Sequence, residues 1–147
     1  MDLDTLKKFL MGFGIKKDLI DEYLKDKKLF LKFNHLYLVD KGFPGKKVFD
    51  DQLLYVALQK NVPSKYFLLS LKKLVDRSLF LKSRDVSLKF LYGKNLSSAL
   101  DYGVTLKENQ RYLVDYQGEI LGYVMFKKER GEFILQNDFH IGDYLRE

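Results

Sequence analysis

The sequence predicts an α+β fold in two parts: an N-terminal part with helices and an antiparallel sheet, then a small β-barrel. Three observations support this prediction. Apolar residues recur at helical spacing near the start of the chain, the spacing changes to every second residue after residue 28, and short apolar segments separated by glycines fill the last third. We place the boundary at the polar segment Ser83-Arg84-Asp85, which gives domains of residues 1–84 and 85–147.

The first expected elements are two amphipathic helices. Leu3 to Phe13 has apolar residues on one helical face, and Gly12 and Gly14 end that helix because glycine favours helix termination. Asp18 to Lys25 repeats the same spacing. Both helices are therefore expected to pack their apolar faces into the core of the first domain.

Strands are expected to dominate the rest of the first domain. Leu29 to Leu38 alternates apolar and polar residues around a turn at Asn34-His35, which predicts a β-hairpin. A loop rich in Gly and Lys follows at residues 41–47. The remaining expected elements are strands at residues 52–59, 66–71 and 79–81 and a short helix at residues 72–77.

The second domain is expected to consist mostly of short strands. A short helix is predicted at residues 96–100, before the strands begin. Gln117-Gly118 and Arg130-Gly131 are the expected hairpin turns, because glycine accepts the backbone conformation that tight turns require. The expected strands are residues 112–116, 119–127 and 132–135, and a helical turn around Asp143-Tyr144 closes the chain.

The distribution of charge indicates a polyanionic partner. The chain has 147 residues, of which 46% are hydrophobic and 15% aromatic, and its net charge is +6. Residues 1–84 contain 18 Lys and Arg against 10 Asp and Glu, whereas residues 85–147 contain 8 against 10. A basic excess in one half favours nucleic acid as the partner.

Other features of the composition narrow the class of protein. The chain has no cysteine, which excludes disulfides and cysteine-bound zinc. No apolar run approaches the ~20 residues that span a bilayer, and the acidic start does not resemble a signal peptide. The sequence has no heptad pattern of the kind that would indicate self-association. We therefore expect an intracellular monomer that does not insert into membranes.

The sequence contains no recognisable catalytic or metal site. His35 and His140 lack further metal ligands at a useful spacing, and the adjacent Asp50 and Asp51 point to opposite faces of any strand. Gly12-Phe13-Gly14 and the loop at residues 42–47 lack the spacing of nucleotide-binding motifs. We expect no enzyme activity, metal or cofactor.

Basic residues at a hairpin tip form the candidate binding site. Lys127, Lys128 and Arg130 lie at the turn expected at Arg130-Gly131, where rigid strands would hold them for phosphate contacts. Exposed Tyr or Phe side chains could add stacking platforms for single-stranded RNA. Hairpin tips are also often charged for solubility alone, so the spacing leaves both interpretations open.

Several segments resemble one family of ribosome-assembly factors. Phe90 to Asn95, Ile120 to Tyr123 and Ile141 to Arg146 are similar, in order, to three segments of the PUA domain of the Nip-seven family, which acts in large-ribosomal-subunit biogenesis. Lys65 to Leu71 and Leu36 to Val39 resemble two strands of the family's N-terminal domain. The likeness covers residues 90–147 best and extends, more weakly, back to about residue 28.

The resemblance implies both a fold and a function. The fold would be an N-terminal α/β domain with an antiparallel sheet, followed by a PUA-type β pseudo-barrel. The function would be non-catalytic RNA binding during ribosome biogenesis and rRNA processing, in the cytoplasm or, for a eukaryotic source, in the nucleolus. The partners would be rRNA and other assembly or RNA-processing proteins, and the family's basic RNA-contact positions fall on Lys127, Lys128 and Arg130.

The chain also departs from the family's pattern. The segment between Gly122 and Ile141 is shorter than in eukaryotic members, His140 replaces an acidic residue, and Val104 stands where the family has an arginine. These differences suggest an archaeal-type member. Two other functions stay open: a PUA-bearing accessory subunit of an RNA-modifying enzyme, and a protein-interaction adaptor in ribonucleoprotein assembly.

Overall fold

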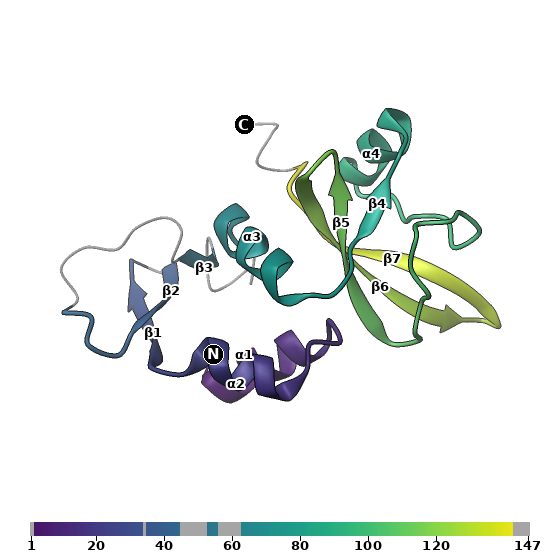
Figure 1. Cartoon of the computed structure of the whole chain (residues 1–147). Helices are drawn as coiled ribbons and strands as arrows, with labels where there is room; N and C mark the ends of the chain where they lie inside the picture. Colours follow the sequence, from purple (N-terminus) through teal and green to yellow (C-terminus); the bar gives the residue numbers. More distant parts are fainter. Residues whose placement is uncertain (1, 34, 45–52, 56–62, 143–147) are drawn as a thin grey trace. The chain divides into compact units, whose positions relative to one another are not determined.

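The computed structural model describes residues 2–33, 35–44, 53–55 and 63–142 and confirms the α+β class (Figure 1). The chain divides into two compact units: unit 1 contains Met1–Met11 and Ile15–Leu74, and unit 2 contains Gly12–Gly14 and Val75–Glu147. Neither sheet, as far as its strands are described, closes into a barrel. None of the described helices is long and apolar enough to cross a membrane.

Unit 1 packs three helices with a three-stranded antiparallel sheet of order β1-β2-β3. Its elements are α1 Leu3–Met11, α2 Lys17–Leu24, β1 Lys27–Lys32, β2 His35–Asp40, β3 Leu53–Tyr55 and α3 Lys65–Leu74. Apolar side chains of α1, α2, β2 and α3 are buried, among them Leu6, Ile20, Val39 and Leu68. The helical spacing at residues 3–25 therefore predicted both N-terminal helices and their buried sides.

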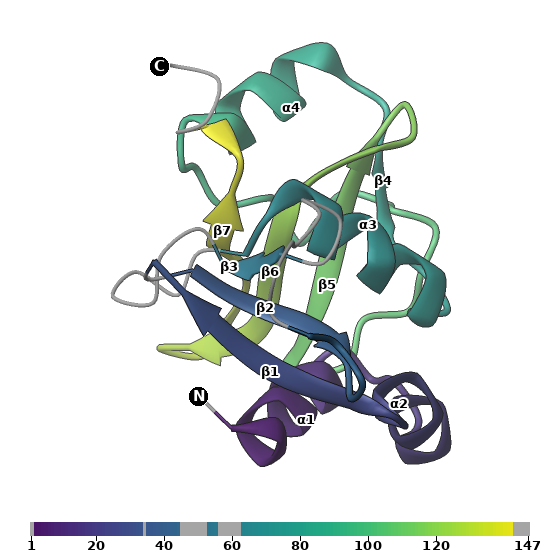
Figure 2. The same ribbon diagram turned by 90° about the vertical axis from the view of Figure 1, so that its left-hand side faces the viewer.

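The β1–β2 hairpin is confirmed, with its turn one residue earlier than expected. Lys32 pairs with His35, so the turn lies between these two residues and His35 begins β2. Figure 2 shows this hairpin leading away from α2 toward its tip. Of the strand expected at residues 52–59, β3 contains Leu53–Tyr55, and the rest lies outside the described residues, as do residue 34 and residues 45–47 of the expected loop.

The strand predicted at residues 66–71 is wrong, because Lys65–Leu74 forms the helix α3. The side-chain oxygen of Ser64 accepts a hydrogen bond from the backbone N–H of Phe67 at 3.1 Å, which caps the helix N-terminus. Phe67, Leu68 and Leu71 are buried at the spacing of one helical face. The helix expected at residues 72–77 is thus the last part of a helix that begins at residue 65 and ends at residue 74.

Unit 2 is built on a four-stranded sheet of order β4-β5-β6-β7. β4 is parallel to β5 and the other pairs are antiparallel. Its elements are β4 Leu79–Leu81, α4 Arg84–Leu91, β5 Gln110–Tyr116, β6 Glu119–Glu129 and β7 Glu132–His140. Ser83, where the domain boundary was expected, is the N-cap of α4 and lies within unit 2.

Both predicted hairpin turns of unit 2 are confirmed. Gln117 and Gly118 have φ of 53° and 88°, and Arg130 and Gly131 have φ of 53° and 83°. Positive φ at both central residues is typical of the tight turn that suits the twist of paired strands. The turns therefore set the register of each hairpin next to the turn, and each register shifts once further along, at Val114/Asp115 in β5–β6 and at Tyr123/Val124 in β6–β7.

The helix predicted at residues 96–100 is wrong. Leu96 forms a β-bridge with Leu135, and the Ser98 hydroxyl donates a hydrogen bond to the Phe133 carbonyl at 3.0 Å. The segment therefore covers the outer edge of β7, and pairing with that edge replaces helical hydrogen bonds. The closing turn expected around Asp143-Tyr144 lies outside the described residues.

Candidate nucleic-acid interface

The three glycine-bearing segments of the C-terminal part converge on His140. Gly122 of β6 pairs directly with His140 of β7. The N–H of Gly142 donates a hydrogen bond to Nδ1 of His140 at 3.1 Å, and the ring of Phe90 lies 6.4 Å from the imidazole. A Cβ added to Gly93 would lie 3.6 Å from Nε2 of the same ring. Residues as far apart in the sequence as Phe90 and Gly142 thus form one packed cluster.

Two of these glycines are required by close backbone packing. A Cβ at Gly122 would lie 2.0 Å from the Phe139 carbonyl oxygen, and one at Gly142 would lie 2.0 Å from the Leu91 carbonyl oxygen. No side chain fits at either position unless the backbone moves. The residues that carry the family resemblance therefore have a structural role, and the imidazole of His140 packs among them.

The predicted binding residues Lys127, Lys128 and Arg130 lie on the β6–β7 hairpin as expected, but they do not form one surface. Lys127 pairs with Ile134, whereas Lys128 pairs with Phe133. Because successive side chains of a strand point to opposite faces of the sheet, the two lysines lie on opposite faces. Arg130 is exposed in the turn between the strands. The sequence analysis treated the three residues as one site because a sequence shows which residues are neighbours in the chain, but not on which face of the sheet each side chain lies.

Lys128 lies beside an exposed aromatic ring. Its Nζ is 5.6 Å from the ring centroid of Phe133, a distance suited to a cation–π contact. Phe133 is 46% exposed and stacks on Phe126 with ring centroids 5.2 Å apart. This face of the hairpin combines a cation with a supported aromatic surface, the combination that stacks and neutralises single-stranded nucleic acid.

Lys127 lies on the other face, close to an acidic group. Burial raises the pKa of Asp138, while the nearby charges of Arg111 and Lys127 act to lower it. Arg111 Nε lies 3.9 Å from Asp138 Oδ2. The positive charge of Lys127 is thus partly offset within the protein, which leaves less of it for a phosphate.

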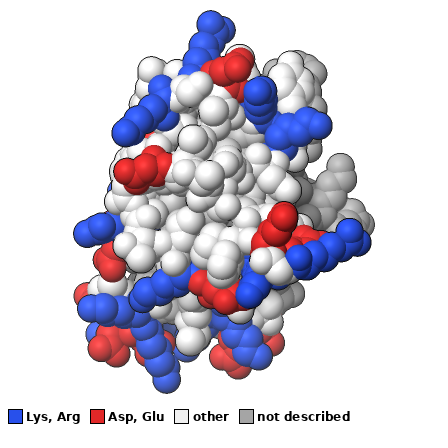
Figure 3. Space-filling view, turned by 90° about the vertical axis from the view of Figure 1, so that its right-hand side faces the viewer, with Lys and Arg blue, Asp and Glu red and all other residues white. Residues whose placement is uncertain are grey.

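The surroundings of the hairpin tip weaken its positive field. Glu129 and Glu132 pair directly across the hairpin, so the five charged residues 127–130 and 132 have a net charge of only +1. Unit 2 as a whole contains 11 Lys and Arg against 11 Asp and Glu. Figure 3 shows Asp and Glu side chains interspersed with the Lys and Arg side chains around an uncharged middle.

Unit 1 holds a larger concentration of positive charge. It contains 15 Lys and Arg against 9 Asp and Glu. A hollow of about 470 Å³ between α1, α2 and the start of β1 is lined by lysines 7, 17, 25, 27 and 41 and by Asp21. Lys7 pairs with Asp21 at 3.6 Å and Lys27 pairs with Asp40 at 2.8 Å.

The remaining three lysines of this hollow, at positions 17, 25 and 41, have no ion pair within the described part of the chain. All three are exposed. Sequence reasoning identified the basic excess of this half but not the hollow, because its lysines come from separate elements. The charge count was the only signal that could have indicated it.

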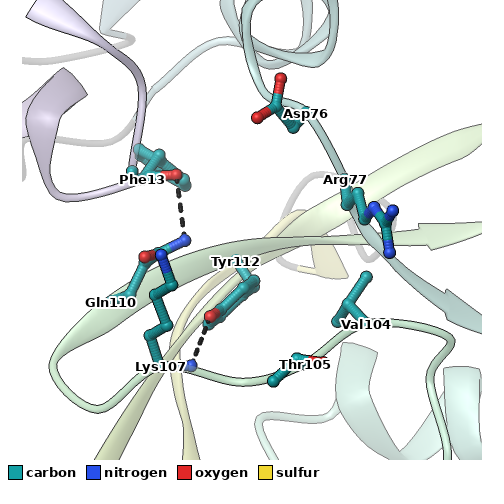
Figure 4. Close-up of a pocket in the computed structure, with 9 residues that line it drawn as sticks. Phe13, Asp76, Arg77, Val104, Thr105, Lys107, Gln110 and Tyr112 are labelled. Atoms are coloured by element: carbon teal, nitrogen blue, oxygen red, sulfur yellow. Dashed lines mark hydrogen bonds between the residues drawn. The ribbon is translucent and has the colours of Figure 1, made fainter.

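A second hollow, of about 280 Å³, lies in unit 2 (Figure 4). Asp76, Arg77 and Lys107 supply its charged groups, and Thr105 and Tyr112 supply hydroxyl groups. Figure 4 shows the Arg77 side chain pointing toward Val104, so a basic group lies beside that apolar residue in the wall of the hollow.

Hydrogen bonds fix the wall of this second hollow. The N–H of Lys107 donates to the Tyr112 hydroxyl at 2.7 Å, and the Gln110 side-chain amide donates to the Phe13 carbonyl at 3.4 Å. The Phe13 ring in turn packs edge-on against Tyr123, with centroids 5.4 Å apart. Gly12-Phe13-Gly14 is therefore a packing segment of unit 2, and the residues lining the hollow suit the binding of a polar group.

The described residues contain no group of three or more His, Asp or Glu placed to hold a metal ion. His35 is the first residue of β2 and packs against Tyr37, with ring centroids 6.4 Å apart. Asp50 and Asp51 lie outside the described residues. In comparisons with known proteins, no family model matches this chain and no curated protein sequence matches it.

Proposed function

We propose that this protein is a non-catalytic RNA-binding factor that acts in biogenesis of the large ribosomal subunit. The observation that carries the proposal is the β6–β7 hairpin, on which Lys128 lies 5.6 Å from an exposed ring, that of Phe133. A cation beside an exposed aromatic ring serves both the phosphates and the bases of a single strand. The assignment to ribosome biogenesis rests on the resemblance of residues 90–147 to the Nip-seven family.

We also propose that unit 2 is a PUA-type domain. The parallel pairing of β4 with β5 around α4, followed by the antiparallel strands β6 and β7, supports this proposal. The convergence of Gly93, Gly122 and Gly142 on His140 supports it further, because the resembling segments then meet in one place.

In this function phosphate contacts supply most of the affinity. Lys128 and Arg130 contact the backbone of the RNA at the hairpin, and the lysines of the hollow in unit 1 add affinity that does not depend on sequence. Each phosphate neutralised on a single strand contributes about −0.7 to the slope of log affinity against log salt. Binding is therefore steeply salt-dependent, and the protein neither forms nor breaks a covalent bond in the RNA.

A salt titration with matched charge reversals tests the proposal. The probe is a single-stranded RNA of mixed sequence, and the variant carries Lys127→Glu, Lys128→Glu and Arg130→Glu together. We expect weaker binding and a flatter salt slope, with the fold retained by circular dichroism. The control replaces three exposed basic residues elsewhere in unit 2, Lys82, Arg84 and Lys89, with glutamate, which changes the net charge equally. Equal losses in both variants would contradict a site at the hairpin.

One observation favours a second function, that of a protein-interaction adaptor. The connection from α4 to β5 has a single charged residue, Asp101, between Asn95 and Leu106, and it exposes 50% of Leu100. An uncharged face suits a protein partner better than RNA. Under this reading Leu100→Ser would abolish capture of an assembly protein, while both charge-reversal variants would retain it.

A further inference from the structure

Phe33 is the most exposed large hydrophobic residue in the described part of the chain. It is 85% exposed and directly follows the last residue of β1, Lys32, in the turn of the β1–β2 hairpin. A single exposed apolar side chain is ordinary on a protein surface. The backbone conformation of Phe33 and the side chains around it, however, indicate that this exposed ring has a function.

Phe33 adopts a backbone conformation that disfavours a bulky side chain. Its φ is +49°, in the left-handed region that Gly, Asn and Asp accept most readily. Two-residue hairpin turns prefer those residues for this reason. Packing cannot offset the strain, since the ring is largely in solvent. A strained, exposed aromatic residue therefore points to a role outside the folding of unit 1.

Cations and aromatic rings share one face of the same hairpin. Lys28, Phe30 and Lys32 alternate along β1, so their side chains lie on one face of the sheet. Tyr37 and His35 pair directly with Phe30 and Lys32 and therefore share that face. All five side chains are partly exposed.

The rings on this face support one another. Phe30 lies 6.5 Å from Tyr37 and 5.3 Å from Phe43, and His35 lies 6.4 Å from Tyr37. Lys32 reaches toward the tip, with Nζ 5.6 Å from the centroid of the Phe33 ring. The result is an aromatic platform edged by positive charge, on the unit that carries the chain's whole basic excess.

We infer that this face of the β1–β2 hairpin binds single-stranded RNA, with a base stacked on Phe33 and a phosphate held by Lys32, whose Nζ lies beside that ring. The inference rests on the proposed RNA-binding function and adds a site in unit 1 on which the flat face of a base stacks. Single strands are the fitting form because bases of a duplex are not available for stacking. The positive charge on the face favours RNA over a neutral protein partner.

The position of Phe33 allows a variant that separates binding from stability. Phe33→Asn removes the ring and places a residue that accepts the left-handed conformation, so the fold should be as stable as wild type or more stable. Phe33→Tyr is the matched control, because it keeps both the ring and the strain. Neither change alters the net charge, so the salt slope should be unchanged in both.

The experiment measures binding of a single-stranded oligouridine containing one 2-aminopurine, together with the melting temperature of each protein. We expect Phe33→Asn to bind about 5- to 150-fold more weakly, the range that loss of one base–aromatic stack produces, and to lose quenching of the 2-aminopurine. Phe33→Tyr should bind as wild type does. This pattern, with an unchanged or higher melting temperature for Phe33→Asn, would support the inference.

Two other outcomes would overturn it in distinguishable ways. If wild type binds the RNA and Phe33→Asn binds equally well, Phe33 is not a stacking residue, while the proposed function stands. If wild type does not bind the RNA at any salt concentration, the proposed function fails and the inference fails with it. Capture of a protein by this hairpin without RNA binding would belong to the second case.

Discussion

Arg111 and Asp138 face each other across β6, with Arg111 Nε 3.9 Å from Asp138 Oδ2. Their side chains are only 28% and 25% exposed. Burial raises the pKa of Asp138 above its ordinary value, and the charges of Arg111 and Lys127 counteract the rise without cancelling it. The ionised carboxylate therefore destabilises the fold at neutral pH, and its negative charge partly neutralises the positive charge of Lys127.

The first prediction concerns the pH dependence of stability in Asp138→Asn. The folded pKa of Asp138 lies above the ordinary value of 3.8. The protonated carboxyl therefore contributes its full stability to the fold below about pH 3.8, and this stability is lost as the pH rises through the folded pKa. Asparagine does not titrate. We expect the two proteins to be similar near pH 3, where aspartate is neutral, and the variant to become relatively more stable toward pH 7. Urea unfolding across this range measures the difference, and a gap independent of pH would contradict the assignment.

The second prediction separates the two lysines of the hairpin. Lys128→Glu should weaken RNA binding and flatten the salt slope by about 0.7 or more, because Lys128 is exposed beside Phe133. Lys127→Glu should have a smaller effect, since Lys127 lies on the opposite face, near Asp138. Salt titrations of both single variants measure this. Equal losses would mean that the RNA contacts both faces of the hairpin.

Much of the fold could be predicted where apolar spacing and turn residues agreed. The hairpin turns at Gln117-Gly118 and Arg130-Gly131 followed from a glycine between two alternating segments. The helix α3 was missed because the apolar run at residues 66–69 is short, and such a run fits a strand and a helix equally well. The deciding signal was Ser64, a helix-capping residue that directly precedes α3.

The candidate site was harder to predict, because the sequence does not show which residues strand pairing and folding bring together. Lys127 and Lys128 were found from their charge, but their separation onto two faces follows from the pairing of β6 with β7. The lysines of the hollow in unit 1 come from helices and strands that only the fold brings together. Phe33 was missed because the turn was expected one residue later, which placed it inside the strand.

The third prediction tests the cap that makes α3 a helix. Ser64→Ala removes the acceptor for the Phe67 N–H, a bond of 3.1 Å at a buried position. Loss of such a cap typically costs about 1 kcal/mol in free energy of unfolding. Ser64→Thr keeps the hydroxyl and should retain most of the stability. Chemical unfolding of both variants measures the difference, and an unaffected Ser64→Ala protein would show that the cap does not stabilise α3.

The fourth prediction asks whether the glycines behind the family resemblance act in structure or in RNA contact. Gly122→Ala places a methyl group 2.0 Å from the Phe139 carbonyl oxygen, at a backbone φ of +150°. The β6–β7 pairing must shift to accept it, so we expect a loss of more than about 4 kcal/mol in free energy of unfolding. Gly131→Ala is the matched control: its φ is +83° and no atom lies within 4 Å of the added Cβ.

Gly131→Ala should therefore cost only the left-handed strain of one residue, about 1–2 kcal/mol. Thermal and chemical unfolding of both variants, with RNA affinity measured on whichever stays folded, separates the two roles. If Gly122→Ala were no less stable than Gly131→Ala, the close approach to Phe139 could not be what requires a glycine. A folded Gly122→Ala protein that had lost RNA binding would then move the binding surface to the cluster around His140, where Gly93 and Gly142 also meet.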